Sequence, residues 1–181
     1  AGRIPEYSAK RLMAVEPEDL SPEQTEVLRL ALIAGGRCAD LLSALGRRGL
    51  AEVTDFGDPL DRQGVFCEAG DYAFCLMEGG EDTRAEALAG RLLDYFDKAV
   101  AAGLRSRDWV ERRALLLLIL DRQKESVDAL REVYELHWLP PGDFYYFDRL
   151  YGQSLRKRED YRRLYDEIEQ KMNRERAKLG W

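Results

Sequence analysis

Histidine, cysteine and nucleotide-binding motifs are scarce or absent in this 181-residue chain, and each shortage limits its chemistry. His137 is the only histidine, so a zinc site built on two or more histidines is excluded, and any serine or cysteine protease chemistry would depend on it. The three cysteines form no CxxC pair, and the chain has neither a GxxxxGK[ST] loop nor a GxGxxG turn. We therefore expect no metal, no cofactor and no enzyme activity.

The chain also lacks a long hydrophobic run, and the basic residues of its C-terminal segment are mixed with acidic ones. The longest apolar run, ALLLLIL at 114–120, has seven residues, whereas a membrane-spanning helix needs about 20. Charged residues make up 34% of the chain, and the net charge is −6. Residues 156–178 hold nine basic and six acidic groups, a net of +3, but the two signs are mixed along the segment. We expect a soluble protein of the cytoplasm or periplasm that neither inserts into membranes nor binds nucleic acid through this segment.

The cysteines are an odd set, Cys38, Cys67 and Cys75, so they cannot form a closed disulfide framework. Cys67 and Cys75 are eight residues apart and could pair across a hairpin of helices. Separate buried thiols are the favoured interpretation, and the Cys67–Cys75 bridge stays the alternative.

Residues 1–64 are expected to form an N-terminal arm, one or two helices and a glycine-rich loop. Ser21 followed by Pro22 predicts a helix start, with the serine hydroxyl as N-cap and proline at the first helical position. Gly35 and Gly36 interrupt the apolar pattern that follows, which leaves one kinked helix or two short ones. The chain lacks an initiator methionine, and we expect it to be a processed form or a piece of a larger bacterial protein.

Residues 65–179 show helical periodicity throughout, and no stretch alternates with a period of two. Thr83 and Glu86 have the spacing of a capping box, and Ser106 or Asp108 is the expected cap of the following helix. The fold class is all-α, in antiparallel pairs with short connections. The expected helices cover about 66–78, 82 or 83 to 102, 106 or 108 to 120, 122–136, a short aromatic helix from 143, and 158–178.

Small residues recur across two of the expected helix breaks. Ala73 and Ala85 are twelve apart around Gly80, and Ala114 and Ser126 are twelve apart around Asp121. The two helices of a hairpin cross most closely at such positions, where a larger side chain would cost about 1–3 kcal/mol. The spacing predicts two helical hairpins offset by 41 residues.

This pattern resembles the tetratricopeptide repeat, a helix pair with small residues on either side of a glycine turn. The stretches YAFCLMEGGEDTRAEALAGRLLDYF and LLLLILDRQKESVDALREVYELHW look like two divergent units. The segment from ALREVYELHW to the C-terminus is similar to the end of the repeat arrays attached to bacterial winged-helix regulators and adenylate cyclases. The resemblance implies a superhelix over 65–179 that ends in a capping helix.

The resemblance also implies a concave surface, lined by the first helix of each pair, that binds a peptide or another protein. A competing interpretation makes the same apolar side chains core and the charged ones solvated. The alternative function is a small-molecule-sensing domain of a bacterial transcriptional regulator, and a homodimer stays open. The candidate binding residues are Asp71, Phe74, Met77, Glu78, Asp108, Glu111 and Arg112.

The last expected helix has one apolar and one charged face, as the terminal cap of a repeat array requires. Its apolar positions are Tyr161, Leu164, Tyr165, Ile168 and Met172. We expect this face to pack on Val133, Tyr134 and the aromatic residues of 144–151.

Overall fold

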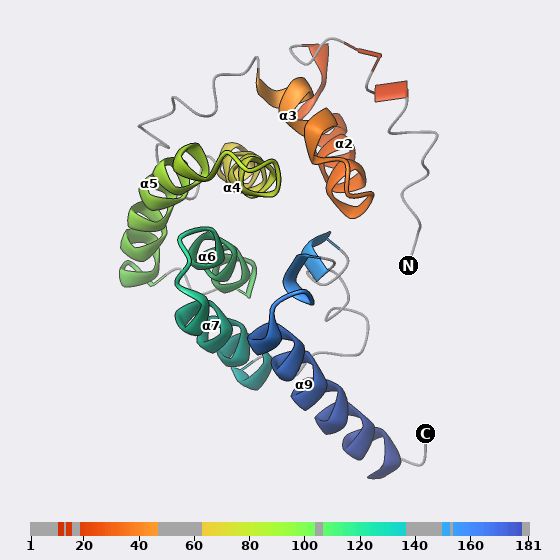
Figure 1. Cartoon of the computed structure of the whole chain (residues 1–181), viewed down its shortest axis with the longest axis vertical. Coiled ribbons are helices and arrows are strands. Elements are labelled where there is room, and N and C mark those ends of the chain that lie inside the picture. Colours follow the sequence, from red (N-terminus) through yellow and green to blue (C-terminus); the bar gives the residue numbers. More distant parts are fainter. Residues whose placement is uncertain are drawn as a thin grey trace.

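The structure is a computed structural model, and the part of the chain that it describes is all-helical, without a strand (Figure 1). It describes residues 11–12, 14–15, 19–46, 63–103, 107–136, 150–152 and 154–178. No helix in these ranges is both long enough and apolar enough to cross a bilayer. The main helices are α2 (Pro22–Ala34), α3 (Cys38–Gly46), α4 (Gln63–Glu78), α5 (Asp82–Ala101), α6 (Arg107–Ile119), α7 (Gln123–Leu136) and α9 (Glu159–Lys178).

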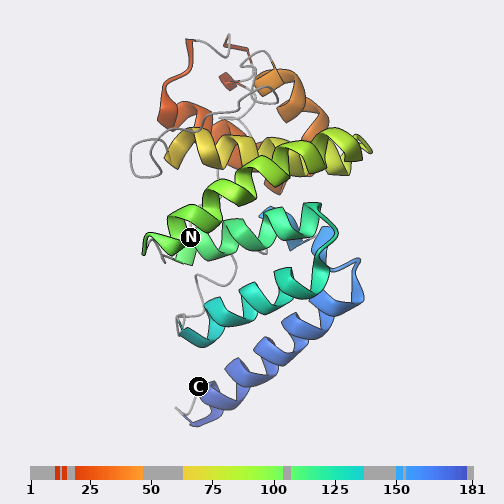
Figure 2. The same ribbon diagram turned by 90° about the vertical axis from the view of Figure 1, so that its left-hand side faces the viewer.

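Consecutive helices pack on one another, and so do the first helices of neighbouring hairpins. Each helix from α2 to α7 contacts the next, while α2 contacts α4 and α4 contacts α6. Figure 1 shows the helices following one another around an arc, and Figure 2 shows them stacked from α2 and α3 at one end to α9 at the other. The first helices of three successive hairpins therefore form a continuous row.

The start of α2 follows from its sequence. The backbone N–H of Gln24 donates to the Ser21 hydroxyl at 3.3 Å, and the Ser21 N–H donates to the Gln24 side chain at 2.9 Å, which completes a capping box. Pro22 occupies the first helical position, as predicted. The chain then forms two short helices, α2 and α3, rather than one kinked helix.

The same type of turn joins the two helices of each hairpin, α2 to α3, α4 to α5 and α6 to α7. Gly36, Gly80 and Asp121 adopt left-handed backbone conformations with φ of 66°, 78° and 55°. In each turn the following N–H reaches back five residues, the pattern of a Schellman motif. These N–H groups belong to Arg37, Glu81 and Arg122, and they donate to the carbonyls of Leu32, Leu76 and Leu117 at 2.8, 2.9 and 2.9 Å.

Some predicted helix boundaries were wrong. Helix α4 begins at Gln63, ahead of the expected 66, whereas α5 begins at Asp82, one of the two predicted starts. The N-cap of α5 is Glu81, which makes no side-chain cap, so the capping box predicted at Thr83 does not form. Thr83 is already helical. Asp108 likewise lies inside α6 and is not its cap, and the helix expected from 143 falls outside the described residues.

The small residues at the predicted crossings are buried. Ala73 and Ala85 are fully buried on the contacting helices α4 and α5. Between α6 and α7, the Ser126 hydroxyl donates to the backbone carbonyl of Ala114 at 2.5 Å. This contact confirms that α6 and α7 meet closely at the second pair, because a hydroxyl reaches only a backbone that lies beside it.

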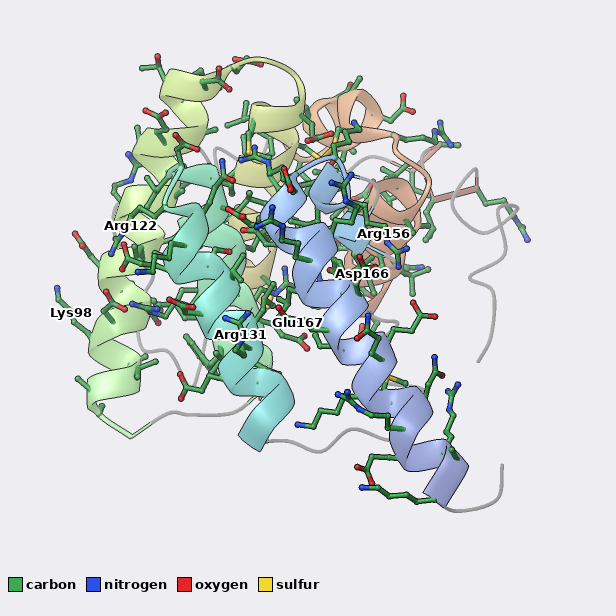
Figure 3. The ribbon with its side chains drawn as sticks, turned by 60° about the horizontal axis from the view of Figure 1, so that its bottom comes forward. Lys98, Arg122, Arg131, Arg156, Asp166 and Glu167 are labelled. Atoms are coloured by element: carbon green, nitrogen blue, oxygen red, sulfur yellow. A yellow bond between two sulfur atoms is a disulfide. The ribbon has the colours of Figure 1, made fainter. Side chains whose placement is uncertain are left out.

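The C-terminal helix α9 packs on α7, as the capping prediction required. Tyr161 is fully buried and donates its hydroxyl to Ser126 on α7 at 2.6 Å. At the surface, Arg131 of α7 lies 3.1 Å from Glu167 of α9 (Figure 3). Tyr134 and the aromatic residues of 144–149 lie outside the side chains that the structure describes.

Candidate binding site on the inner face

The carboxylate of Asp71 on α4 lies at the centre of a buried polar cluster. Arg112 of α6 places Nη1 2.5 Å from Asp71 Oδ1, and Arg29 of α2 pairs with Oδ2. The exposed fractions are 0% for Asp71, 5% for Arg29 and 15% for Arg112. A buried carboxylate is tolerated only when it is paired and hydrogen-bonded, so the two arginines allow Asp71 to remain charged in the interior.

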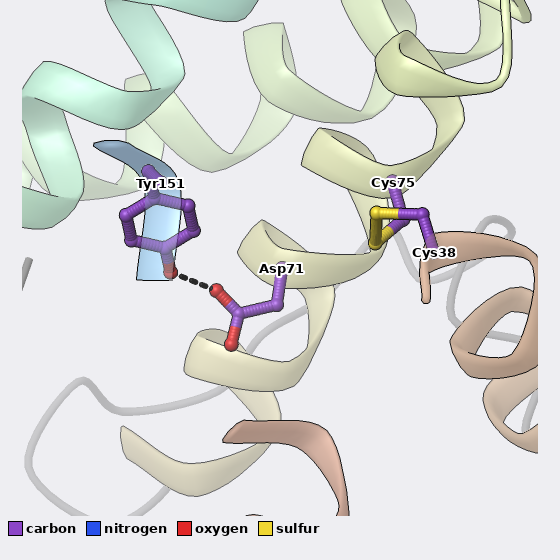
Figure 4. Close-up of a disulfide and its surroundings, with 4 residues drawn as sticks. All are labelled: Cys38, Asp71, Cys75 and Tyr151. Atoms are coloured by element: carbon purple, nitrogen blue, oxygen red, sulfur yellow. Dashed lines mark hydrogen bonds between the residues drawn. A yellow bond between two sulfur atoms is a disulfide. The ribbon is translucent and has the colours of Figure 1, made fainter. Parts of the chain in front are cut away.

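The fourth member of the cluster comes from residues 150–152, which we call the inner segment. The Tyr151 hydroxyl donates to Asp71 Oδ1 (Figure 4), and it accepts a hydrogen bond of 2.9 Å from Arg112 Nη1. The Tyr151 ring meets the ring of Phe74 edge to face, with centroids 5.0 Å apart and planes at 73°. Tyr151 is 2% exposed. The inner segment therefore lies against the first helices of the hairpins, inside the arc of Figure 1.

The cluster of Asp71, Arg29 and Arg112 holds more positive than negative charge, because two guanidinium groups share one carboxylate. Burial lowers the pKa of Arg29, and the neighbouring charge of Arg112 lowers that pKa further. Arginine nevertheless stays protonated at neutral pH, since its ordinary pKa is above about 12. Nε of Arg29 has no hydrogen-bond partner among the residues that the structure describes.

The structure brings together three of the seven predicted binding residues: Asp71, Phe74 and Arg112. Of the other four, Glu111 is buried, Met77 is half-buried and Glu78 is exposed. The side chain of Asp108 lies outside the described part of the chain. Tyr151 contacts both Asp71 and Phe74, which are 0% and 3% exposed, so neither presents a surface to a partner while the inner segment is in place.

Two members of the cluster were missed from the sequence, Arg29 and Tyr151. Arg29 stands in the apolar run VLRLALIA, where a charged residue on a buried helix signals an ion pair. That signal identifies the residue but not its partner. Tyr151 was assigned to an aromatic packing cluster, and no local pattern distinguishes a packing tyrosine from one that binds a carboxylate.

The disulfide of the structure joins Cys38 of α3 to Cys75 of α4, with their Cα atoms 4.9 Å apart (Figure 4). The favoured expectation of separate thiols was wrong, and so was the alternative Cys67–Cys75 bridge. Cys67 and Cys75 lie on the same helix, eight residues and therefore about 12 Å apart along its axis, which is too far for a disulfide. Cys67 remains a free, half-buried thiol.

Comparison of the chain with protein-family models, curated proteins and solved structures finds no match.

Proposed function

We propose that this chain is a non-catalytic, tetratricopeptide-like repeat module that binds a peptide or protein segment on the inner face of its first helices. The contacts of α2 with α4 and of α4 with α6 support this proposal, because first helices stack in this way in a repeat array. The shared turn at Gly36, Gly80 and Asp121 supports it as well.

The single observation that carries the proposal is the inner segment itself. A short piece of polypeptide lies on the inner face, and its tyrosine is held by groups from two helices, Asp71 and Phe74 of α4 and Arg112 of α6. Arg29 of α2 pairs with the same Asp71 carboxylate. The face therefore has the chemistry to hold a peptide: a ring to pack against, and a buried charge to hydrogen-bond.

The proposal extends the repeats toward the N-terminus, beyond the region in which the sequence suggested them. The turn at Gly36 precedes that at Gly80 by 44 residues, and Gly80 precedes Asp121 by 41. On this reading α2 and α3 are the first repeat. The small-residue pattern did not reveal it, because the equivalent positions hold Arg29 and Leu41.

The disulfide weighs against the alternative, a sensing domain of a transcriptional regulator. Such a regulator works in the cytosol, where thiols are kept reduced, whereas disulfides persist in oxidising compartments such as the periplasm. The Cys38–Cys75 bridge therefore favours a binding module outside the cytosol.

The test is a selection of peptides from a random display library against the whole protein. We expect selected peptides to lose at least tenfold in affinity for Glu78→Arg, because Glu78 is exposed two helical turns after Asp71 on the same face of α4. The matched control is Glu86→Arg on α5, an exposed glutamate outside that face. Equal affinity for both variants and the unaltered protein would contradict the proposal.

A further inference from the structure

We propose that the inner segment is an intramolecular ligand, and that the partner of this module presents a tyrosine side chain to the same four residues. This inference rests on the proposed function and names its ligand class. We call the four residues the tyrosine socket: Arg29, Asp71, Phe74 and Arg112.

The tyrosine socket recognises a phenol rather than a plain aromatic ring. The Tyr151 hydroxyl donates to one partner, the Asp71 carboxylate, and accepts from another, Arg112. A phenylalanine can do neither, while the edge-to-face contact with Phe74 requires an aromatic ring and so rejects serine or threonine. Tyrosine supplies both features in one rigid group, with a single oxygen that donates and accepts.

The socket belongs to the helical array, whereas its ligand belongs to the chain that follows the array, where Leu150 and Tyr151 are buried in the same core. Arg29, Asp71 and Arg112 come from α2, α4 and α6, whose mutual contacts do not involve the inner segment. The ligand arrives from 80 residues beyond Asp71. The unused Nε donor of Arg29 offers a partner one hydrogen bond that Tyr151 does not make, among the residues described. A partner segment with an acceptor beside its tyrosine therefore gains a contact that the inner segment lacks.

Tethering explains why the inner segment occupies the tyrosine socket in the free protein. A ligand attached to its own receptor acts at an effective concentration on the order of millimolar. A partner that must displace it binds with an affinity reduced by the fraction of molecules whose socket is open. Removal of the Tyr151 side chain is therefore expected to raise the affinity for a tyrosine peptide added in solution.

The test uses the whole protein and a fluorescent nonapeptide with the sequence of residues 150–158, LYGQSLRKR. Fluorescence anisotropy is expected to show at least tenfold tighter binding to Tyr151→Ala than to the unaltered protein. The same peptide with phenylalanine in place of its tyrosine is expected to bind Tyr151→Ala at least fivefold more weakly. Tyr95→Ala, which truncates a half-buried tyrosine on α5, is the matched control and is expected to behave like the unaltered protein.

Circular dichroism checks that Tyr151→Ala keeps its helices. If it does not, Tyr151→Phe keeps the ring, loses the hydroxyl, and is expected to bind the tyrosine nonapeptide at least threefold more tightly than the unaltered protein. Equal affinity of the folded variant and the unaltered protein overturns the inference, and so does equal affinity for the tyrosine and phenylalanine peptides.

Failure of this inference is distinguishable from failure of the proposed function. Library peptides that depend on Glu78 but bind the unaltered protein and Tyr151→Ala equally would support a binding module while overturning the intramolecular ligand. Size-exclusion chromatography with light scattering addresses a second copy as the occupant. A dimer that dissociates in Tyr151→Ala would mean that copies exchange their inner segments, and would overturn the assignment to a different partner.

Discussion

At the scale of single residues, the strongest electrostatic constraint acts on the carboxylate of Asp71. Its removal from water costs several kcal/mol, which only close cationic and hydrogen-bonding groups can offset. Arg29, Arg112 and the Tyr151 hydroxyl supply those groups from three other parts of the chain. The cluster therefore stabilises the fold only while it is complete.

The substitution Asp71→Asn is expected to lower the free energy of unfolding by about 3–5 kcal/mol, because it leaves two buried guanidinium groups without a counter-charge. Urea denaturation followed by circular dichroism measures the change. The control is Asp40→Asn, since the Asp40 pair with Arg37 is exposed by 40% and 42% and exposed pairs contribute little. Similar losses for both variants would show that Asp71 is not under special constraint.

Tyr161 predicts a stability change at alkaline pH. Burial raises its pKa to about 12 from an ordinary value of 10.0, while the hydrogen bond to Ser126 partly opposes the shift. The unfolded chain therefore releases this proton at lower pH than the folded protein. The contribution of Tyr161 to the free energy of unfolding is fully present below pH 10. It falls by about 2–3 kcal/mol as the pH rises toward 12.

Urea denaturation of Tyr161→Phe at several pH values isolates this effect from the other tyrosines. The variant is expected to be slightly less stable at pH 7, because it loses the hydrogen bond to Ser126. Between pH 10 and 12 it is expected to lose less stability than the unaltered protein. Parallel curves for the two proteins would contradict the raised pKa.

At the scale of elements, the contact between α6 and α7 depends on the size of two side chains. Ala114 and Ser126 are each 1% exposed, and the Ser126 hydroxyl links the Ala114 carbonyl to Tyr161 of α9. One hydrogen-bonded chain therefore joins α6, α7 and α9.

The substitution Ala114→Leu is expected to lower the melting temperature by several degrees, because overpacking costs about 1–3 kcal/mol. Differential scanning calorimetry measures the shift. The control is Ala87→Leu, an exposed alanine on α5 where the added volume meets solvent. An unchanged melt for Ala114→Leu would show that the two helices can separate without cost.

At the scale of the whole molecule, the disulfide holds the first hairpin on the second. Cys38 of α3 and Cys75 of α4 are separated by 37 residues, and Cys75 lies one helical turn after Asp71. The bridge and the Arg29–Asp71 ion pair therefore join the same two hairpins. If either the disulfide or the ion pair is lost, the contact between these two hairpins is expected to depend more strongly on the one that remains.

Reduction is expected to lower the free energy of unfolding by about 4 kcal/mol, the chain-entropy value for a loop of this size. Urea denaturation with and without a phosphine reductant measures the difference. The double variant Cys38→Ala/Cys75→Ala is the control, because the reductant should not change its stability. Thiol alkylation of the unfolded chain should label one cysteine before reduction and three after it, and three labels before reduction would contradict the bridge.

Local signals in the sequence were sufficient for the helical class, the cap at Ser21 and the breaks near Gly36, Gly80 and Asp121. Each depends on residues within one or two helical turns, so short-range hydrogen bonding and steric preference specify it. The twelve-residue spacing of Ala114 and Ser126 was readable for the same reason, because both residues belong to one hairpin. Thr83 shows the limit of such signals, since the N-cap of α5 is Glu81, two residues before the cap that the Thr83 and Glu86 spacing predicted.

The tyrosine socket and the disulfide were decided by tertiary packing. Arg29 and Tyr151 lie 42 residues before and 80 residues after Asp71, and Cys38 lies 37 before Cys75. No local pattern encodes such pairings, because they depend on which helix faces meet once the hairpins stack. Within the array, the buried carboxylate of Asp71 is already paired with Arg29 and Arg112. The inner segment completes the cluster because Tyr151 packs its ring against Phe74 and donates its hydroxyl to Asp71.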